Sequence, residues 1–128
     1  MRLLLDTVAL LWLLADAPEL SAAARRELAD SEAEIYVSPV STWEIVTKYR
    51  LGQLPLPAPP EELLPRERRA RGLLEAPLGE AAVLHLGRLP LLHRDPFDLM
   101  LICQAIEEQL VIVTPDTMIR RYPVKTFW

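Results

Sequence analysis

The sequence predicts an α/β fold in which helices cover both faces of a central, mainly parallel β-sheet, giving three layers, α/β/α. Short apolar runs alternate along the chain with longer helix-like segments, as in parallel strands that are joined by crossover helices. Most of these runs are apolar throughout, which is typical of strands buried on both faces. The 128 residues, 51% of them hydrophobic and 25% charged, suffice for one globular domain, and we assign residues 1–128 to it.

The first elements are a strand and two helices. Residues 2–5 form an apolar run that ends at Asp6 and predicts a buried strand. The mostly apolar segment 8–15 predicts a helix, which Pro18 closes. Residues 21–31 are rich in Ala, Arg and Glu and predict a more exposed helix.

A second strand and a well-delimited helix follow. Residues 34–37 alternate in polarity, which suits a strand. Ser38 can cap the next helix, and Pro39 fits its first position. That helix is expected to run to about Arg50, where Gly52 is placed as a C-terminal cap residue would be.

The middle of the chain begins with an extended connector. The prolines of residues 54–60 (LPLPAPP) forbid a helix interior and predict a rigid, extended segment. The next elements are expected to be a charged helix, a third strand, a short helix and a loop, at residues 61–71, 73–76, 79–87 and 89–94.

The last third contains the most apolar helix, which starts at Asp95-Pro96 and covers residues 97 to about 109. The β-branched run 110–113 predicts a buried strand. Asp116 is expected to begin another short helix, and residues 124–127 are expected to form a final edge strand.

Acidic residues directly follow two of these strands. Asp6 comes after the first strand, and Asp116 comes shortly after the run 110–113. Right-handed crossovers place the carboxyl ends of parallel strands at one edge of the sheet, where ligands bind, so the two carboxylates can converge. The alternative is that each aspartate only caps the helix that follows it.

Glu44 is a further candidate, on the helix that begins at the end of the second strand. With Ser41 and Lys48 it forms a polar stripe at i, i+3 and i+7. The alternative is a solvent-facing Glu44–Lys48 pair, which contributes only about 0.2–0.5 kcal/mol. The position of the helix near the same sheet edge favours a functional Glu44, with Ser41 and Lys48 as supporting or substrate-binding residues.

The densest polar cluster is the segment HRDPFD at 93–98. Asp95 can cap the helix that begins at Pro96, and Asp98, at the third helical position, can complete a capping box. The rest of this helix is apolar on nearly every face and must be buried, so its first turn is expected beside the sheet edge. Asp95 and Asp98 are therefore candidates for the same site.

Asp6, Glu44, Asp98 and Asp116, with Asp95 as a fifth candidate, predict a metal site made of oxygen ligands. Like charges raise one another's pKa values, so clustered carboxylates cannot all ionise without a cation. Oxygen ligands select Mg²⁺ or Mn²⁺. One or two such ions can activate water for the displacement of a phosphodiester. The cluster therefore predicts phosphodiester hydrolysis without a protein nucleophile.

Charge and cysteine content restrict the alternatives. The formal net charge of −4, from 14 basic and 18 acidic residues, argues against a wholly basic coat protein of nucleic acid but not against an RNA substrate. The single cysteine, Cys103, excludes an internal disulfide and fits a reducing, cytoplasmic compartment. The apolar stretch near the N-terminus is too short to span a bilayer, and no serine-hydrolase elbow or P-loop occurs.

Four ordered motifs resemble those of PIN-domain ribonucleases: LLLDT at 3–7, SPVSTWEI at 38–45, HRDPFD at 93–98 and VTPD at 113–116. The resemblance is to the VapC-type toxins of type II toxin–antitoxin pairs and covers essentially the whole chain. It implies an α/β/α fold and Mg²⁺- or Mn²⁺-dependent cleavage of RNA by metal-activated water. It also implies a homodimer and a cognate antitoxin protein.

The resemblance also implies individual roles. The four acidic positions of the family correspond to Asp6, Glu44, Asp98 and Asp116. Asp95 either coordinates the metal or only caps its helix. Thr114 matches a hydroxyl residue that often accompanies the last aspartate. Where some members carry a basic residue after the third acid, this chain has Leu99, which leaves Arg94 as the nearest residue that could contact phosphate.

The resemblance implies a small antitoxin whose tail enters the active-site groove and blocks it. We expect the bulky exposed surface that binds it to include Trp12, Trp43, Tyr49 and residues 51–60.

Two other functions are weighed against a nuclease. An aspartate-phosphorylated receiver domain also gathers acids and Mg²⁺ at strand ends, but it needs paired acids after the first strand and a lysine after the last. Here Asp6 stands alone, and Lys125 is almost at the end of the sequence. A non-catalytic PIN-like scaffold that binds RNA or protein is disfavoured because all four acids are present.

Overall fold

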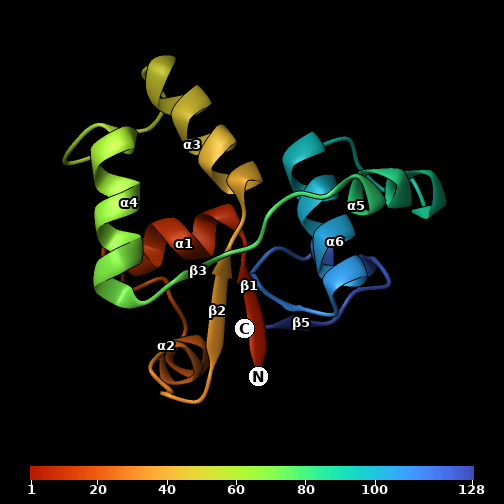
Figure 1. Cartoon of the computed structure of the whole chain (residues 1–128), viewed down its shortest axis with the longest axis horizontal. Coiled ribbons are helices and arrows are strands. Elements are labelled where there is room, and N and C mark those ends of the chain that lie inside the picture. The colour runs from red at the N-terminus through yellow and green to blue at the C-terminus, as the bar shows by residue number, and fades with distance from the viewer.

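The computed structural model describes all 128 residues and contains one five-stranded sheet in the order β3-β2-β1-β4-β5 (Figure 1). Its strands are β1 (Arg2–Leu5), β2 (Glu34–Val37), β3 (Leu74–Glu75), β4 (Val111–Val113) and β5 (Thr126–Phe127). Every neighbouring pair is parallel. The predicted parallel sheet is therefore confirmed.

Six α-helices connect and cover the strands. They are α1 (Thr7–Leu14), α2 (Ala22–Leu28), α3 (Pro39–Arg50), α4 (Pro60–Arg71), α5 (Glu80–His85) and α6 (Pro96–Glu108). Two 3₁₀-helices lie at Leu86–Arg88 and Ile119–Arg121. None of the helices has both the length and the apolar character needed to cross a membrane.

Two hydrophobic cores, one on each face of the sheet, confirm the three layers. Leu4 and Ile112 of the central strands belong to the core that contains the apolar side of α6. Leu3, Leu5 and Val113 point to the other face, into the core shared with α1 and α2. Successive side chains of a strand point to opposite faces, so both faces of β1 are apolar because both are covered. In Figure 1, α5 and α6 lie on one side of the strands, and α1, α2 and α4 lie on the other.

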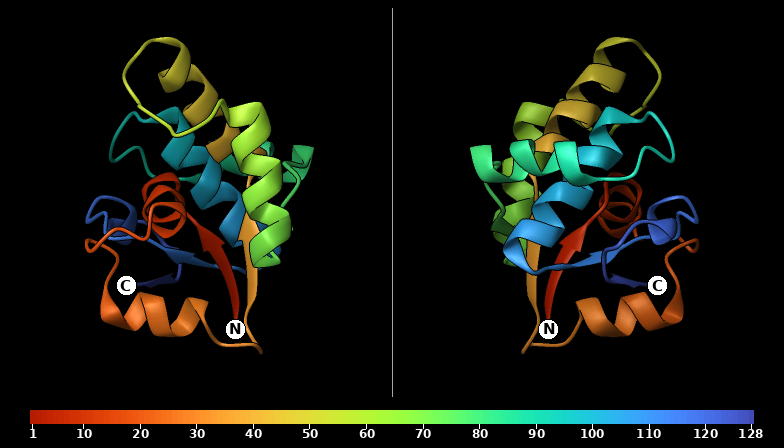
Figure 2. Two further views of the ribbon diagram at one scale, coloured as in Figure 1. Left: turned by 90° about the vertical axis from the view of Figure 1, so that its left-hand side faces the viewer. Right: turned by 90° about the vertical axis from the view of Figure 1, so that its right-hand side faces the viewer.

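The helix α3 begins where the sequence predicts, and its cap explains why. The Ser38 hydroxyl accepts a hydrogen bond from the Val40 amide at 3.0 Å, and Pro39 is the first helical residue. Gly52 has a φ of +69°, the left-handed conformation that ends a helix. Both side views place α3 at one end of the molecule and α2 at the other, so α3 extends from the carboxyl edge of the sheet (Figure 2).

The helix predicted to begin at Asp116 is wrong. The Asp116 carboxylate accepts a hydrogen bond from the Met118 amide at 2.8 Å, which stabilises a turn. Only a 3₁₀-helix follows, at Ile119–Arg121, and it stops before Pro123 because a residue that precedes proline disfavours helical backbone.

The two edge strands are shorter than predicted. The expected strands 73–76 and 124–127 contain two strand residues each, Leu74–Glu75 and Thr126–Phe127. The predicted helix 21–31 likewise ends at Leu28, and the predicted helix 79–87 divides into α5 and the first 3₁₀-helix. These differences affect the ends of elements and leave their order unchanged.

Candidate active site at the carboxyl edge of the sheet

The order of the strands reverses direction between β1 and β4. From β1 the chain adds β2 and β3 on one side, and then crosses to the other side to add β4 and β5. Ligands of open α/β sheets bind outside the carboxyl ends of the strands at such a reversal. Leu5 pairs with Val113 at the end of these two strands, so Asp6 and Thr114 follow them side by side.

Asp6 is held in place by its backbone and by the start of α1. Its amide donates to the Val113 carbonyl at 3.2 Å, and its carboxylate accepts from the Ala9 amide at 2.7 Å. The side chain is almost completely buried, with the residue only 3% exposed. The predicted cap is therefore real, and it fixes the carboxylate at the end of β1.

Burial raises the pKa of Asp6 to about 7. Hydrogen bonds from the Thr114 hydroxyl and from the Ala9 amide oppose this shift, whereas the charges of Asp98 and Asp116 raise the pKa further. Three acids from separate parts of the chain therefore interact electrostatically at this edge. The charges of Asp98 and Asp116 thus act on Asp6, and their convergence into one metal site stays a prediction.

Thr114 connects two of these acids. It is completely buried, and its hydroxyl accepts a hydrogen bond from the Asp116 amide at 3.0 Å. Through its contact with Asp6 it joins the end of β1 to the turn that carries Asp116. Thr114 therefore lies beside both acids, and the supporting role that the resemblance implies for it stays a prediction.

Asp98 lies in the first turn of α6, with a side chain that is 18% exposed. Burial raises its pKa to about 6, and the charges of Asp95 and Asp116 add to this effect, while a hydrogen bond with His93 lowers the pKa. The carboxylate of Asp98 is directed to His93 and not to the backbone at the start of the helix. The capping-box alternative for Asp98 is therefore wrong.

Asp95 is the residue that caps α6. One of its oxygens, Oδ1, accepts from the amides of Phe97 at 2.9 Å and Asp98 at 3.2 Å. Its negative charge also raises the pKa of Asp98. Asp95 thus has a structural role and lies near the acidic cluster as well.

Glu44 meets the cluster through Lys48. Glu44 is only 6% exposed, and its Oε2 accepts a hydrogen bond from the ammonium of Lys48 at 2.6 Å. That bond raises the pKa of Lys48, as do the charges of Asp95 and Asp98. The pair is therefore not an ordinary solvent-facing one, because its carboxylate is buried, although the Lys48 side chain is 46% exposed.

These donors suit a hard divalent cation. The groups are carboxylates, and their burial, together with the charges of neighbouring acids, raises the pKa values of Asp6 and Asp98; a bound cation would favour their ionised form. No three His, Cys, Asp or Glu side chains lie close enough together in this conformation to enclose an ion. Rotation of these short side chains would be needed to complete such a site.

Buried polar contacts that the sequence does not reveal join the elements around this edge of the sheet. The Thr7 hydroxyl donates to the hydroxyl of Ser41 at 3.0 Å and joins α1 to α3. Gln104 of α6 is completely buried, hydrogen-bonds to Ser38, and donates to the Ala76 carbonyl at 2.8 Å. Ser41, predicted to support the site or bind substrate, is therefore a buried link between helices.

His93 and Tyr122 form a second unforeseen contact, which His93 joins to Asp98. His93 Nε2 lies 3.2 Å from Asp98 Oδ2, and His93 Nδ1 lies 2.8 Å from the Tyr122 hydroxyl. The position of His93 in the motif HRDPFD could have suggested its role. Nothing in the sequence indicates Tyr122, which approaches from the 3₁₀-helix after β4.

The remaining candidate residues lie on the surface. Arg94 is exposed and forms no ion pair. Trp43 is 55% exposed and packs its edge on Phe97, whereas Trp12 is partly covered by Trp128. Tyr49 is partly buried.

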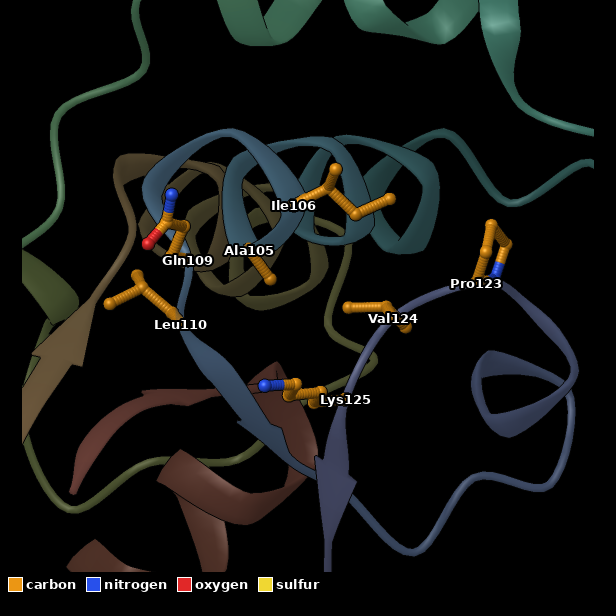
Figure 3. Close-up of a pocket in the computed structure, with 7 residues that line it drawn as sticks. All are labelled: Ala105, Ile106, Gln109, Leu110, Pro123, Val124 and Lys125. Atoms are coloured by element: carbon orange, nitrogen blue, oxygen red, sulfur yellow. The ribbon is translucent and has the colours of Figure 1, made fainter.

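Two hollows lie apart from the carboxylates. A groove of about 480 Å³ is lined by Trp12 and other apolar residues of α1, by part of the 54–60 connector and by α4. A second pocket, at the opposite end of α6, lies between Ala105, Leu110 and Val124 (Figure 3). None of the acidic candidates lines either hollow.

Comparison with known proteins matches residues 3–125 to the model of the PIN domain family. Among solved structures, VapBC2 from Rickettsia felis bound to a DNA fragment from its promoter superposes with a TM-score of 0.77 at 20% identity, over 100% of this chain and 99% of the other. DNA-bound VapBC from Salmonella typhimurium superposes with a TM-score of 0.69 at 19% identity, over 99% of this chain and 97% of the other. FitAcB from Neisseria gonorrhoeae superposes with a TM-score of 0.66 at 18% identity, over 98% of this chain and 96% of the other. No curated protein sequence matches the chain.

Proposed function

The chain belongs to the PIN-domain family, and from this premise we propose that it is a Mg²⁺- or Mn²⁺-dependent endoribonuclease that acts as the toxin of a toxin–antitoxin pair. One observation supports the activity above all others. Asp6, Asp98 and Asp116 come from three separate segments, and their charges interact at the carboxyl edge of the sheet. General PIN-domain chemistry, hydrolysis of a phosphodiester, is what such a cluster of oxygen ligands can support.

Each residue of the cluster has a role in this proposal. Asp6, Glu44, Asp98 and Asp116 would hold the metal, with Asp95 as a fifth candidate. When bound, one or two ions would supply an activated water and neutralise charge on the phosphate. Thr114 holds the carboxylate of Asp6, and the ammonium of Lys48 provides positive charge near Asp95 and Asp98 that can attract the RNA backbone.

RNA cleavage with defined ends tests the activity. We expect the wild type to cut RNA in Mg²⁺ or Mn²⁺ and to be inactive in EDTA. The products should carry no 2′,3′-cyclic phosphate, because water and not the 2′-hydroxyl of the RNA would be the nucleophile. Asp6→Asn should reduce the rate at least a hundredfold while preserving the cap of α1, since asparagine caps helices as well as aspartate does.

Asp16→Asn is the matched control for this test. Asp16 is an exposed aspartate with a φ of +49°, which asparagine tolerates, and its ion pair with Arg25 lies on the surface. The Asp16→Asn variant should cleave RNA at the wild-type rate. Equal cleavage by Asp6→Asn, or cleavage that persists in EDTA, would contradict the proposal; a folded, RNA-binding chain that never cleaves would favour the scaffold function instead.

The proposed partners are an antitoxin protein and a second copy of this chain. The solved neighbours named VapBC and FitAcB support an antitoxin partner for this chain, and the apolar groove beside Trp12 offers it a docking surface. Co-expression with the protein encoded next to it should give one complex on gel filtration. Separate elution of the two proteins would contradict this part of the proposal, and light scattering on the chain alone tests the homodimer.

The receiver-domain alternative is not retained. Receiver domains have the flavodoxin-like strand order 2-1-3-4-5. The order here is β3-β2-β1-β4-β5, and the family match is to the PIN domain.

A further inference from the structure

The Tyr122 hydroxyl lies at the centre of a small buried network beside the acids. Tyr122 is 4% exposed and belongs to the core on the α6 side of the sheet. Its oxygen lies 3.1 Å from the amide nitrogens of Leu92 and His93, and 2.8 Å from His93 Nδ1. The hydroxyl therefore has three nitrogen neighbours and no other hydrogen-bond partner.

The protons of this network can be counted. A hydroxyl has one hydrogen to donate and two lone pairs to accept with. The two backbone amides can only donate, so they occupy both lone pairs of the Tyr122 oxygen. The one remaining hydrogen can be given only to His93 Nδ1, which must then be the acceptor nitrogen of the ring.

The tautomer of His93 follows from this count. A neutral imidazole whose Nδ1 accepts must carry its hydrogen on Nε2. That nitrogen lies 3.2 Å from Oδ2 of Asp98, so the ring donates to the carboxylate. A ring with its hydrogen on Nδ1 would leave the tyrosine hydrogen without an acceptor and would turn a bare nitrogen towards Asp98.

The geometry points to Tyr122 and His93 as positioning residues: Tyr122 fixes His93 in its Nε2–H tautomer, and His93 thereby holds the Asp98 carboxylate at the metal site. The metal site itself rests on the proposed function. His93 donates to the oxygen of the ligand and leaves the other carboxylate oxygen, Oδ1, available. Outer hydrogen bonds of this kind orient carboxylate ligands, and their loss typically weakens metal binding about 10–100-fold.

Nitrogen-15 NMR of the wild type measures the tautomer directly, without metal or RNA. At pH 8 we expect His93 to show the Nε2–H pattern, with Nδ1 as the unprotonated nitrogen. The chain has only two histidines, so His85→Gln both assigns the spectrum and serves as a control. His85 is also paired with a carboxylate, Glu107, at 3.1 Å, but lies on α5.

Variants connect the tautomer to metal binding. Tyr122→Phe should give a mixture of His93 tautomers and weaken Mn²⁺ binding, measured by calorimetry, about tenfold or more. Tyr36→Phe is its matched control, because the Tyr36 hydroxyl bonds the surface carboxylate of Glu34, and it should bind Mn²⁺ like the wild type.

Two substitutions of His93 distinguish hydrogen-bond donation to Asp98 from a role in packing alone. The amide nitrogen of His93→Gln can take the place of Nε2 and should retain most of the Mn²⁺ affinity. In His93→Asn the amide lies near the Nδ1 position, so this variant should lose most of the Mn²⁺ affinity. A residue that only fills space would not distinguish the two amides, and circular dichroism shows that each variant is folded.

The failures of the two proposals look different. Wild-type protein that binds Mn²⁺ and cleaves RNA but has His93 in the Nδ1–H form would overturn the positioning role and leave the nuclease intact. Equal Mn²⁺ affinity in His93→Gln and His93→Asn would overturn it as well. Wild-type protein with the Nε2–H form that binds no Mn²⁺ would overturn both the metal site and the role of His93 in it.

Discussion

At the scale of single residues, the buried carboxyl of Asp6 is the costliest feature of the site. Its pKa is raised to about 7, and that of Asp98 to about 6, from an ordinary value of 3.8. Between about pH 4 and pH 7 the folded protein therefore keeps protons that the unfolded chain has released. The free energy of unfolding of the metal-free protein should fall as the pH rises through this window and level off above it.

Asp6→Asn tests this pH dependence. Asparagine keeps the cap on the Ala9 amide but cannot ionise, so the variant should be more stable than the wild type at pH 8 by a few kcal/mol, since one pKa unit corresponds to about 1.4 kcal/mol. At pH 4 the two proteins should have nearly the same free energy of unfolding. Urea unfolding in EDTA measures both values, and a wild type whose stability did not change between pH 4 and pH 8 would refute the burial argument.

The Glu44–Lys48 pair gives a second prediction. Lys48→Met should destabilise the fold at pH 8 by about 1–2 kcal/mol, because it leaves a buried carboxylate without its partner. Lys48 is half exposed, so water moderates the loss. The matched control is Arg71→Met, which breaks the i, i+4 pair with Glu67, a carboxylate more exposed than that of Glu44, and should cost less than about 0.5 kcal/mol. Similar losses in the two variants would show that Glu44 is solvated.

The sequence revealed the acids but not their partners. Asp6 and Asp116 could be predicted because both follow strands, and strand ends meet at one edge of a parallel sheet. The hydrogen bond between Tyr122 and His93 could not be predicted, because it joins residues that are 29 positions apart and lie in segments without periodicity. The buried Thr7–Ser41 contact could not be predicted either, because it joins residues 34 positions apart on two different helices.

At the scale of elements, helix starts were predicted best because the signals are local. Ser38-Pro39 and Asp95-Pro96 begin α3 and α6 with the side-chain caps that the pattern indicates. The helix predicted after Asp116 is absent for two reasons. A hydrogen bond from a following amide to an aspartate carboxylate can begin either a helix or a turn, and Pro123 lies too close for a full helix to form. The short edge strands depend on pairing with one neighbour, which no local signal encodes.

Ser38 connects a local cap with the tertiary structure. Ser38→Ala removes the bond to the Val40 amide and leaves buried Gln104 without its hydroxyl partner, so it should cost about 2–3 kcal/mol. Ser21→Ala, which removes a partly exposed cap of α2, should cost about 1 kcal/mol. Denaturant unfolding of both variants measures the difference, and equal losses would mean that the Gln104 contact contributes nothing.

At the scale of the whole molecule, the strand order determines where chemistry can occur. The order β3-β2-β1-β4-β5 places the reversal between β1 and β4, and Asp6 and Thr114 stand at the ends of these strands. Without the four candidate acids, Asp6, Glu44, Asp98 and Asp116, the chain has 14 acidic and 14 basic residues. The net negative charge can thus be assigned to the site, where bound cations would offset it before RNA approaches.

The central claim is that carboxylates from three separate segments hold a divalent ion at this edge of the sheet. Crystals of the wild type soaked in Mn²⁺, with anomalous diffraction recorded near the manganese absorption edge, locate any bound ion directly. The account predicts an anomalous peak about 2.1 Å from oxygens of Asp6 and of Asp98 or Asp116. The absence of a peak at these side chains under saturating Mn²⁺, or one bound only at other residues, would contradict it.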